Sequence, residues 1–402
     1  MRALAASSVL LFHVWLYSSP GGEAVRVGQL TRVLPDLSFG VTLFFTLSGF
    51  LLYRPFVAAL IRATGRPSFG AYLRNRAFRI LPAYWVILLL TALVLRSAGV
   101  RDAAGDLEVQ GAPGLEWLAK NLLLVQNYTP SGILTGIPPA WSLAVEVVFY
   151  LVLPALVLLG ALVAKRADTR AGRAAALLVP PLVMLVLGLV GKASSAVVGS
   201  GPDDGWGADW SSVLERSFLS HADLFAFGMA LAVARVLAED GALRVGGRAR
   251  GAIAVAAVGT YAFTTHSMTG WGQLTNSPLN TVMAASCALL LALVVLPPAS
   301  TRQSAIVRAL ETRPVLFVGL VSYSVFLWHL PVIHAMREHG LTRPGALGFF
   351  VNVVTVGAVT LVLSTLTYRF VEEPALRRKR PASRPSGRSG GTLDPAPSAE
   401  IA

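Results

Sequence analysis

Apolar residues dominate ten stretches of the chain, each 16 to 25 residues long, and polar or glycine- and proline-rich connections separate them. A helix needs about 20 apolar residues to cross a bilayer, so this pattern is typical of transmembrane helices. The stretches cover residues 2–18, 39–60, 81–98, 141–163, 174–196, 218–237, 251–266, 279–297, 314–337 and 346–370. The sequence therefore predicts an all-α, polytopic membrane protein with about ten transmembrane helices.

Composition agrees with a membrane protein. Of the 402 residues, 54% are hydrophobic and 14% are charged, whereas a soluble domain carries about 25% charged residues. The single cysteine, Cys287, excludes a disulfide framework and a cysteine zinc cluster. A net charge of +13 would suggest nucleic acid as the partner of a soluble protein, but here it is explained by arginine-rich cytoplasmic connections.

Lysine and arginine residues alternate between the connections. If Arg2 is cytoplasmic, 25 of the 34 basic residues lie on its side of the membrane and nine lie on the other side. This bias predicts ten helices with both termini in the cytoplasm. Residues 1–373 are expected to form one transmembrane domain. Residues 374–402, rich in proline, serine, glycine and charge, are expected to form a disordered cytoplasmic tail.

Two ionisable residues share one face of the first helix. Arg2 and His13 are eleven residues apart, which is about 16 Å and three turns of an α-helix. This spacing predicts Arg2 at one membrane surface and the imidazole deep in the hydrocarbon, where an ionisable group is a functional candidate. The alternative interpretation is an arginine that caps the helix and a histidine packed in the core.

The predicted topology places three more ionisable residues at a depth similar to that of His13. They are Glu146, Asp223 and His329, each in the outer part of its helix. Charged groups at this depth are costly in contact with lipid, so they suggest a shared polar cavity. A carboxylate beside an imidazole can orient a general base, and Glu146 is the candidate. Interhelical hydrogen bonds that only hold the bundle together are the alternative.

A cluster of arginines precedes the third apolar stretch. Arg74, Arg76 and Arg79 are expected in a cytoplasmic connection, and Tyr84 and Trp85 follow at the interface. Guanidinium groups bind phosphates in a bidentate manner, so the cluster is a candidate phosphate site. Positive-inside anchoring explains the same pattern, and the sequence does not separate the two interpretations.

Several motifs, taken in order, resemble the integral-membrane acyltransferase-3 family. They are the Arg2–His13 spacing, FFTLSGFLL at 44–52, RNR at 74–76 leading into RILPAYW at 79–85, WSLAVEVVFY at 141–150, SYSVFLWHLP at 322–331 and YRFVEEP at 368–374. Members of this family are ten-helix O-acyltransferases that modify sugars and natural products. The resemblance covers about residues 1–378, and it depends on the order and spacing of the motifs together.

The resemblance implies a donor and a catalytic residue. The donor would be an acyl-coenzyme A, with acetyl as the expected group, approaching from the cytoplasm of a bacterial cell. Arg74 and Arg76, together with Arg79 and Tyr84, would hold the coenzyme, and His13 would be the essential catalytic residue. The acceptor would be a hydroxyl of a carbohydrate, glycolipid or secondary metabolite such as a macrolide-type antibiotic.

Each candidate residue then receives an expected role. His13 would act as the general base with Glu146 orienting it, and an acyl-histidine intermediate remains an alternative. Ser48 is expected to pack or to form a hydrogen bond rather than to act as a nucleophile. The residues expected to contact the acceptor are Arg2, Trp141, Ser142, Asp223, Tyr323 and His329. The sequence shows no metal-ligand spacing, so no metal is expected.

Two other classes of protein fit parts of the pattern. A transporter of an acylated or polyprenyl-linked molecule would use the intramembrane ionisable residues as a proton relay. A structural or assembly protein would leave these residues without a role. Among the three classes, only the enzyme should bind and consume acyl-coenzyme A.

The predicted topology can be tested with reporter fusions. Because basic residues favour the cytoplasmic side, reporters placed after Arg66, Arg170 and Arg388 should report a cytoplasmic location. Reporters near Gly111 and Asp204 should report an external one. A reversed reporter at any of the first three positions would contradict the cytoplasmic placement of the arginine cluster.

Overall fold

The computed structural model describes residues 1–21, 23–65, 67–101, 107–108, 114–198, 207–267, 278–297 and 304–378. Each of the ten predicted apolar stretches is helical. The long helices and the short α6 are α1 (Arg2–Tyr17), α2 (Phe39–Ile61), α3 (Phe69–Leu89), α5 (Trp141–Ala164), α6 (Arg170–Ala176), α7 (Val179–Val198), α9 (Ala222–Glu239), α10 (Gly247–Ser267), α11 (Pro278–Val295), α13 (Arg313–Glu338) and α14 (Gly345–Thr367). The described chain is therefore an all-α bundle.

Short elements connect the long helices. They are η1 (Gly28–Arg32), η2 (Leu34–Ser38), the π-helical η3 (Leu90–Val94), β1 (Val100–Arg101), β2 (Leu107–Glu108), α4 (Leu115–Leu122), η4 (Gln126–Tyr128), η5 (Pro130–Gly132), η6 (Pro138–Ala140), α8 (Trp210–Glu215), η7 (Leu219–His221), α12 (Ala305–Leu310), the π-helical η9 (Tyr368–Glu372) and α15 (Glu373–Arg377). Strands β1 and β2 form one antiparallel pair. Helix α4 has eight residues and is too short to cross a membrane.

Eight helical segments of the described chain are long and apolar enough to cross a membrane. This supports a polytopic membrane protein. Helix α1 has 16 residues and is shorter than a typical span. Helix α10 has 21 residues, but it is not among these eight segments. The count of ten spans and the cytoplasmic location of both termini stay predictions.

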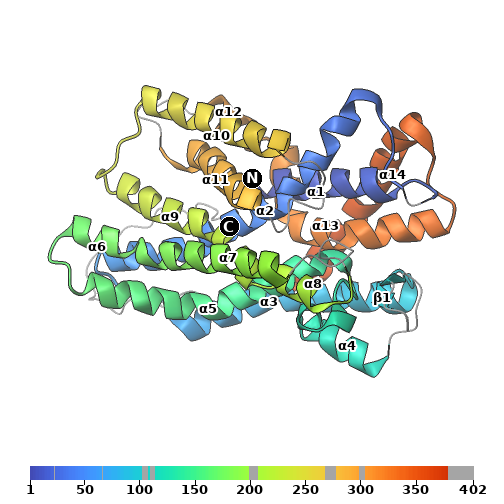
Figure 1. Cartoon of the computed structure of the whole chain (residues 1–402), viewed down its shortest axis with the longest axis horizontal. Coiled ribbons are helices and arrows are strands. Elements are labelled where there is room, and N and C mark those ends of the chain that lie inside the picture. Colours follow the sequence, from blue (N-terminus) through green and yellow to red (C-terminus); the bar gives the residue numbers. More distant parts are fainter. Residues whose placement is uncertain are drawn as a thin grey trace, which may run out of the picture.

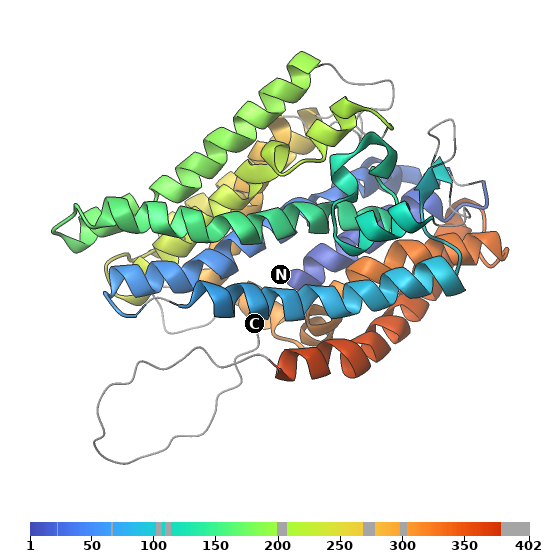
Figure 2. The same cartoon turned by 90° about the horizontal axis from the view of Figure 1, so that it is seen from below.

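The connections gather at the two ends of an elongated bundle (Figure 1, Figure 2). Helix α6 and the α2–α3 connection lie at one end. Helix α4 and strand β1 lie at the opposite end, together with the α13–α14 connection. This arrangement agrees with the predicted alternation of the connections.

The N-terminal end of α1 lies inside the bundle. In both views it is near the middle of the long axis, rather than at an end with the connections (Figure 1, Figure 2). The expectation that Arg2 lies at one membrane surface is therefore not met. The physical reason is that the surrounding helices enclose a polar cavity, described below, and the guanidinium group of Arg2 extends into it.

Helix α3 begins twelve residues before its predicted start at residue 81. The hydroxyl of Ser68 caps its first turn by accepting the amide N–H of Ala71 at 3.4 Å. The predicted location of Arg74, Arg76 and Arg79 in a connection is therefore wrong, because all three lie on this helix. Hydropathy detects only the apolar second half of the helix, and the arginine-rich first half has one side turned toward the polar cavity.

Helices α2 and α9 are in backbone contact through two glycines. A Cβ atom at Gly49 would lie 2.2 Å from the carbonyl oxygen of Phe225, and one at Gly228 would lie 1.9 Å from that of Thr46. Neither position has room for a side chain. Small residues allow this close approach, which is common between membrane helices.

The predicted boundary at residue 374 falls inside a helix. Helix α15 continues from Glu373 to Arg377, and residues 379–402 lie outside the described residues. The prediction of a disordered tail is therefore not tested beyond this helix.

Candidate functional site

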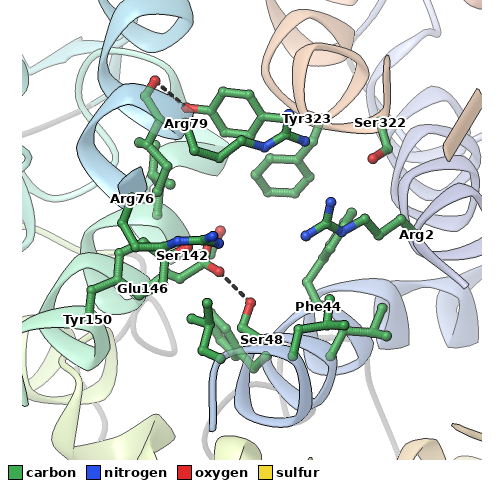
Figure 3. A pocket seen from close by; sticks show the side chains of 17 residues that line it. Arg2, Phe44, Ser48, Arg76, Arg79, Ser142, Glu146, Tyr150, Ser322 and Tyr323 are labelled. Atoms are coloured by element: carbon green, nitrogen blue, oxygen red, sulfur yellow. Dashed lines mark hydrogen bonds between the residues drawn. The ribbon is translucent and has the colours of Figure 1, made fainter. Parts of the chain in front are cut away.

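A cavity near the N-terminal end of α1 brings together side chains from five helices (Figure 3). Its empty volume, including the open mouth, is about 780 Å³. Its polar lining consists of Arg2 from α1, Ser48 from α2, Arg76 and Arg79 from α3, Ser142, Glu146 and Tyr150 from α5, and Ser322 and Tyr323 from α13. Phenylalanine, leucine and isoleucine side chains complete the wall.

The cavity carries an excess of positive charge. Three guanidinium groups line it, those of Arg2, Arg76 and Arg79, and Glu146 is the one carboxylate among the described lining residues. In Figure 3 the guanidinium group of Arg2 points toward the centre, opposite Arg76 and Glu146. An excess of cations in a mainly apolar surrounding attracts anions strongly, because the local dielectric constant is low.

Glu146 is held by a serine of the second helix. The hydroxyl of Ser48 donates a short hydrogen bond to its carboxylate (Figure 3). Tyr150 lies one turn further along α5 and lines the same cavity. The expected role of Ser48 as a hydrogen-bonding residue is confirmed by this contact.

His13 contacts a second histidine. The Nδ1 atom of His13 lies 3.1 Å from Nε2 of His329 on α13, and the two ring centroids are 4.8 Å apart. Tyr17 stacks on His13, with 5.9 Å between the two ring centroids. His13 is half-buried, and His329 is fully buried.

The expected contact between His13 and Glu146 is not formed. Within the described part of the chain, the polar contacts of His13 are with His329 and the carbonyl of Val9. Glu146 instead lines the cavity together with Arg2, which is about 16 Å along α1 from His13. The prediction assigned depth by counting residues from the start of each helix, and this method ignores tilt and the lateral position of each helix.

The hydrogen bonds of His13 select one tautomer. Its Nδ1 atom is 2.9 Å from the carbonyl oxygen of Val9, and a carbonyl only accepts, so Nδ1 carries the hydrogen. In the neutral ring, Nε2 therefore keeps its lone pair. Nε2 of His329 lies 3.1 Å from the same Nδ1 atom. The contact with Val9 thus holds His13 in the tautomer whose Nε2 can accept a proton.

A layer of aromatic rings separates the cavity from the two histidines. Phe326 lines the cavity, and its ring centroid is 5.8 Å from that of His329. Phe44 also lines the cavity and packs edge-on against Phe326 at 5.4 Å. The cavity and the histidine pair are therefore adjacent, and Phe326 lies between them.

Besides His13, His329 and Asp223, three predicted site residues lie outside the cavity. Tyr84 is buried, and its hydroxyl donates to the carbonyl of Asn121 at 2.7 Å. Arg74 lies on α3 but does not line the cavity. Trp141 packs against Arg216, whose guanidinium carbon is 4.9 Å from the ring centroid. In contrast, Ser142 and Tyr323, expected on the acceptor side, lie with the arginines.

Asp223 belongs to a separate buried group. Its carboxylate forms an ion pair with Lys192 of α7, and both side chains are at most 2% exposed. The hydroxyl of Thr281 donates to the same carboxylate at 2.6 Å. The prediction that Asp223 shares a polar cavity with His13 is therefore not met, because Lys192, which lies inside α7, pairs with the carboxylate.

Four residues around the cavity received no role from the sequence. Tyr150 and Ser322 line it, and Glu372 and Ser324 lie behind Arg79. Glu372 and Ser324 belong to the YRFVEEP and SYSVFLWHLP motifs, so the motifs were noticed but these positions received no role. A glutamate directly after the apolar stretch that ends at residue 370 was the available signal.

Comparison with known proteins gives the family. A family model described as an acyltransferase domain matches residues 1–369, which is most of the chain. The chain belongs to the acyltransferase-3 family. No solved structure matches this acyltransferase-3 chain.

Two curated relatives of this acyltransferase-3 chain are distant. It is 31% identical to the O-acetyltransferase OatA of Staphylococcus aureus over 70 residues, which cover 17% of this chain and 11% of OatA. It is 29% identical to Nodulation protein 10 of Rhizobium leguminosarum bv. viciae over 171 residues, which cover 39% and 42% of the two chains. The matched regions span less than half of either relative.

Replacing Asp223 with alanine tests whether this residue is structural. The change leaves the charge of Lys192 buried without its carboxylate, and such a loss costs about 3–5 kcal/mol. We expect a clear fall in the melting temperature of the detergent-purified protein. The control is Glu116→Ala, because that carboxylate is 79% exposed in its pair with Lys120 and should contribute at most about 1 kcal/mol. An unchanged melting temperature for Asp223→Ala would show that the pair is not structural.

Proposed function

We propose that this protein transfers an acetyl group from acetyl-coenzyme A to a hydroxyl of a carbohydrate or secondary metabolite. The proposal rests on one observation. The cavity that three arginines line is next to the pair of His13 and His329, and Phe326 lies between the cavity and His329. The cavity offers the charge that binds a phosphorylated donor. The histidine offers the base that activates a hydroxyl. The family membership supports the combination.

The donor would bind with its phosphates at Arg2, Arg76 and Arg79. Guanidinium groups form bidentate, charge-assisted hydrogen bonds with phosphate oxygens, and the cavity has two more such cations than carboxylates. This assignment replaces Arg74 and Tyr84 with Arg2 as a donor-binding residue, because Arg2 lines the cavity and the other two do not. The arm that carries the thioester would extend past Phe326 toward His13.

The chemical step would use Nε2 of His13. The acceptor hydroxyl oxygen attacks the thioester carbonyl carbon while Nε2 takes the hydroxyl proton. The C–S bond then breaks, and the imidazolium returns the proton to the departing thiolate. His329 would help to orient the ring, because its Nε2 lies 3.1 Å from Nδ1 of His13, while the Nδ1–H bond to the carbonyl of Val9 leaves Nε2 free to accept. Attack by Nε2 itself, through an acyl-histidine, would use the same tautomer.

Glu146 would act in the donor compartment. Its carboxylate lies among the arginines and is fixed by Ser48, so it offsets part of their positive charge and limits their mutual repulsion. Glu146 would therefore not orient His13, because it is not among the described polar contacts of His13.

The acceptor and the membrane are inferred from relatives. One relative is named as an O-acetyltransferase, which supports acetyl as the group and oxygen as the acceptor atom. The bacterial sources of both relatives support a bacterial cytoplasmic membrane as the location. Coenzyme A would approach from the cytoplasm, where the basic connections are predicted to lie.

The donor site can be tested by replacing Arg76 with alanine. One lost charge-assisted phosphate contact corresponds to about 1.5–3 kcal/mol, so the dissociation constant for acetyl-coenzyme A should rise about 10- to 100-fold. Arg76→Lys should recover part of the loss, since lysine cannot form the bidentate contact. The measurement is equilibrium binding of radiolabelled acetyl-coenzyme A to purified protein.

Arg74→Ala is the matched control for Arg76→Ala. Arg74 lies on the same helix, two residues away, but outside the cavity. We expect binding of acetyl-coenzyme A close to that of the unmodified protein. Equal losses in the two variants would point to the general charge of α3 rather than to the cavity, and normal binding by Arg76→Ala would contradict the proposed donor site.

The catalytic role can be tested by replacing His13 with alanine. Loss of a general base slows a reaction by about 10²–10⁴-fold, and loss of a nucleophile slows it more. We expect transfer of labelled acetyl into membrane or cell-surface material to fall by at least this factor, while binding of acetyl-coenzyme A stays near normal. Substantial transfer by a folded His13→Ala variant would exclude the mechanism.

A further inference from the structure

The segment that follows α14 packs against α3, where Glu372 forms an ion pair with Arg79. The helix changes there to the π-helical turn η9, which ends at Glu372. The Glu372 side chain is 1% exposed, whereas its neighbour Glu373 is 35% exposed and forms an ion pair with Arg377. Two adjacent glutamates thus point in different directions, one into the bundle and one out of it. π-Helical turns often occur at functional sites.

Glu372 holds two groups inside the bundle. Its Oε2 atom accepts from Nη1 of Arg79 at 3.2 Å, and its Oε1 atom accepts from the hydroxyl of Ser324 at 2.5 Å. Helix α13 therefore fixes one oxygen of the carboxylate, and α3 receives the other. Within the described part of the chain, this is the ion pair that joins the C-terminal helices to the cavity.

The guanidinium group of Arg79 is fixed from a second side. It lies over the ring of Tyr323, with 5.8 Å between its central carbon and the ring centroid. The Tyr323 hydroxyl in turn donates to the carbonyl of Ile80 at 2.9 Å, so the ring is tied to the backbone next to Arg79 (Figure 3). The side chain of Arg79 is 13% exposed and lines the cavity.

This arrangement leaves part of the guanidinium group available to a ligand. Glu372 takes one of the five N–H groups of Arg79, and the planar group keeps the others in a rigid plane. An arginine that is already held in its binding orientation loses less side-chain entropy when a phosphate binds.

We propose that Glu372 is a positioning residue of the donor site, which aims the guanidinium group of Arg79 at a phosphate of acyl-coenzyme A. The inference rests on the proposed function, because it takes the cavity as the donor site. It assigns the C-terminal YRFVEEP segment a part in donor binding. A purely structural carboxylate that fastens α14 to α3 is the competing explanation.

A double-mutant cycle separates the two explanations. The variants are Glu372→Gln, Arg79→Ala and their combination, and the measurement is the dissociation constant for radiolabelled acetyl-coenzyme A. Glu372→Gln keeps the shape and removes the charge, and we expect it to weaken binding about 3- to 20-fold. Arg79→Ala should weaken binding about 10- to 100-fold. The double variant should bind no more weakly than Arg79→Ala, because Glu372 acts through that arginine.

Two further variants complete the test. Glu373→Gln is the matched control and should bind as the unmodified protein does. Ser324→Ala removes one bond to Glu372 and leaves both charges, so it carries the test if Glu372→Gln does not fold. It should weaken binding by a smaller factor, and this effect should disappear in the Arg79→Ala background.

The possible results are distinct. Normal binding by folded Glu372→Gln, or losses that multiply in the double variant, would overturn the positioning role while the donor site stands. Normal binding by Arg79→Ala together with Arg76→Ala would overturn the donor site itself, and the positioning role with it. A loss in Glu372→Gln that depends on Arg79 supports the proposal.

Discussion

Charged groups inside an apolar bundle need a partner or a polar cavity, because lipid cannot solvate them. Each described group at the site obeys this constraint in its own way. Arg2 extends into the cavity, Glu146 accepts from Ser48, and the two histidines contact each other. The charged and polar side chains therefore contact one another or line the cavity. The proposed chemistry uses these same groups.

The sequence predicts the fold well because hydropathy and charge bias are properties of continuous segments. All ten predicted stretches are helical. It predicts the members of the site less well, because contacts between helices depend on tilt, rotation and lateral order. Arg76 and Arg79 were found from their charge, but Arg2 was placed at the wrong depth. Glu372 was missed because its partner, Arg79, is distant in the sequence.

The pairing of His13 could not be derived from residue spacing. Counting residues from the helix ends put Glu146 and His329 at one depth, and the structure brings only His329 to His13. The difference matters chemically. A carboxylate partner would stabilise a charged imidazolium, whereas an imidazole partner adds no negative charge. The arrangement therefore suits a base that is uncharged before the reaction.

The glycine contacts between α2 and α9 have a consequence for how ligands enter. Because the two backbones touch at Gly49 and Gly228, no side-chain rotation can let one helix slide past the other. Helix α2, which supplies Ser48 and Phe44, therefore behaves as part of a rigid half. The α3 wall of the cavity meets the C-terminal segment through side chains, among them Arg79 and Glu372. Side-chain rotation alone can change the contacts of the α3 wall, and it cannot change the backbone contact that fixes α2.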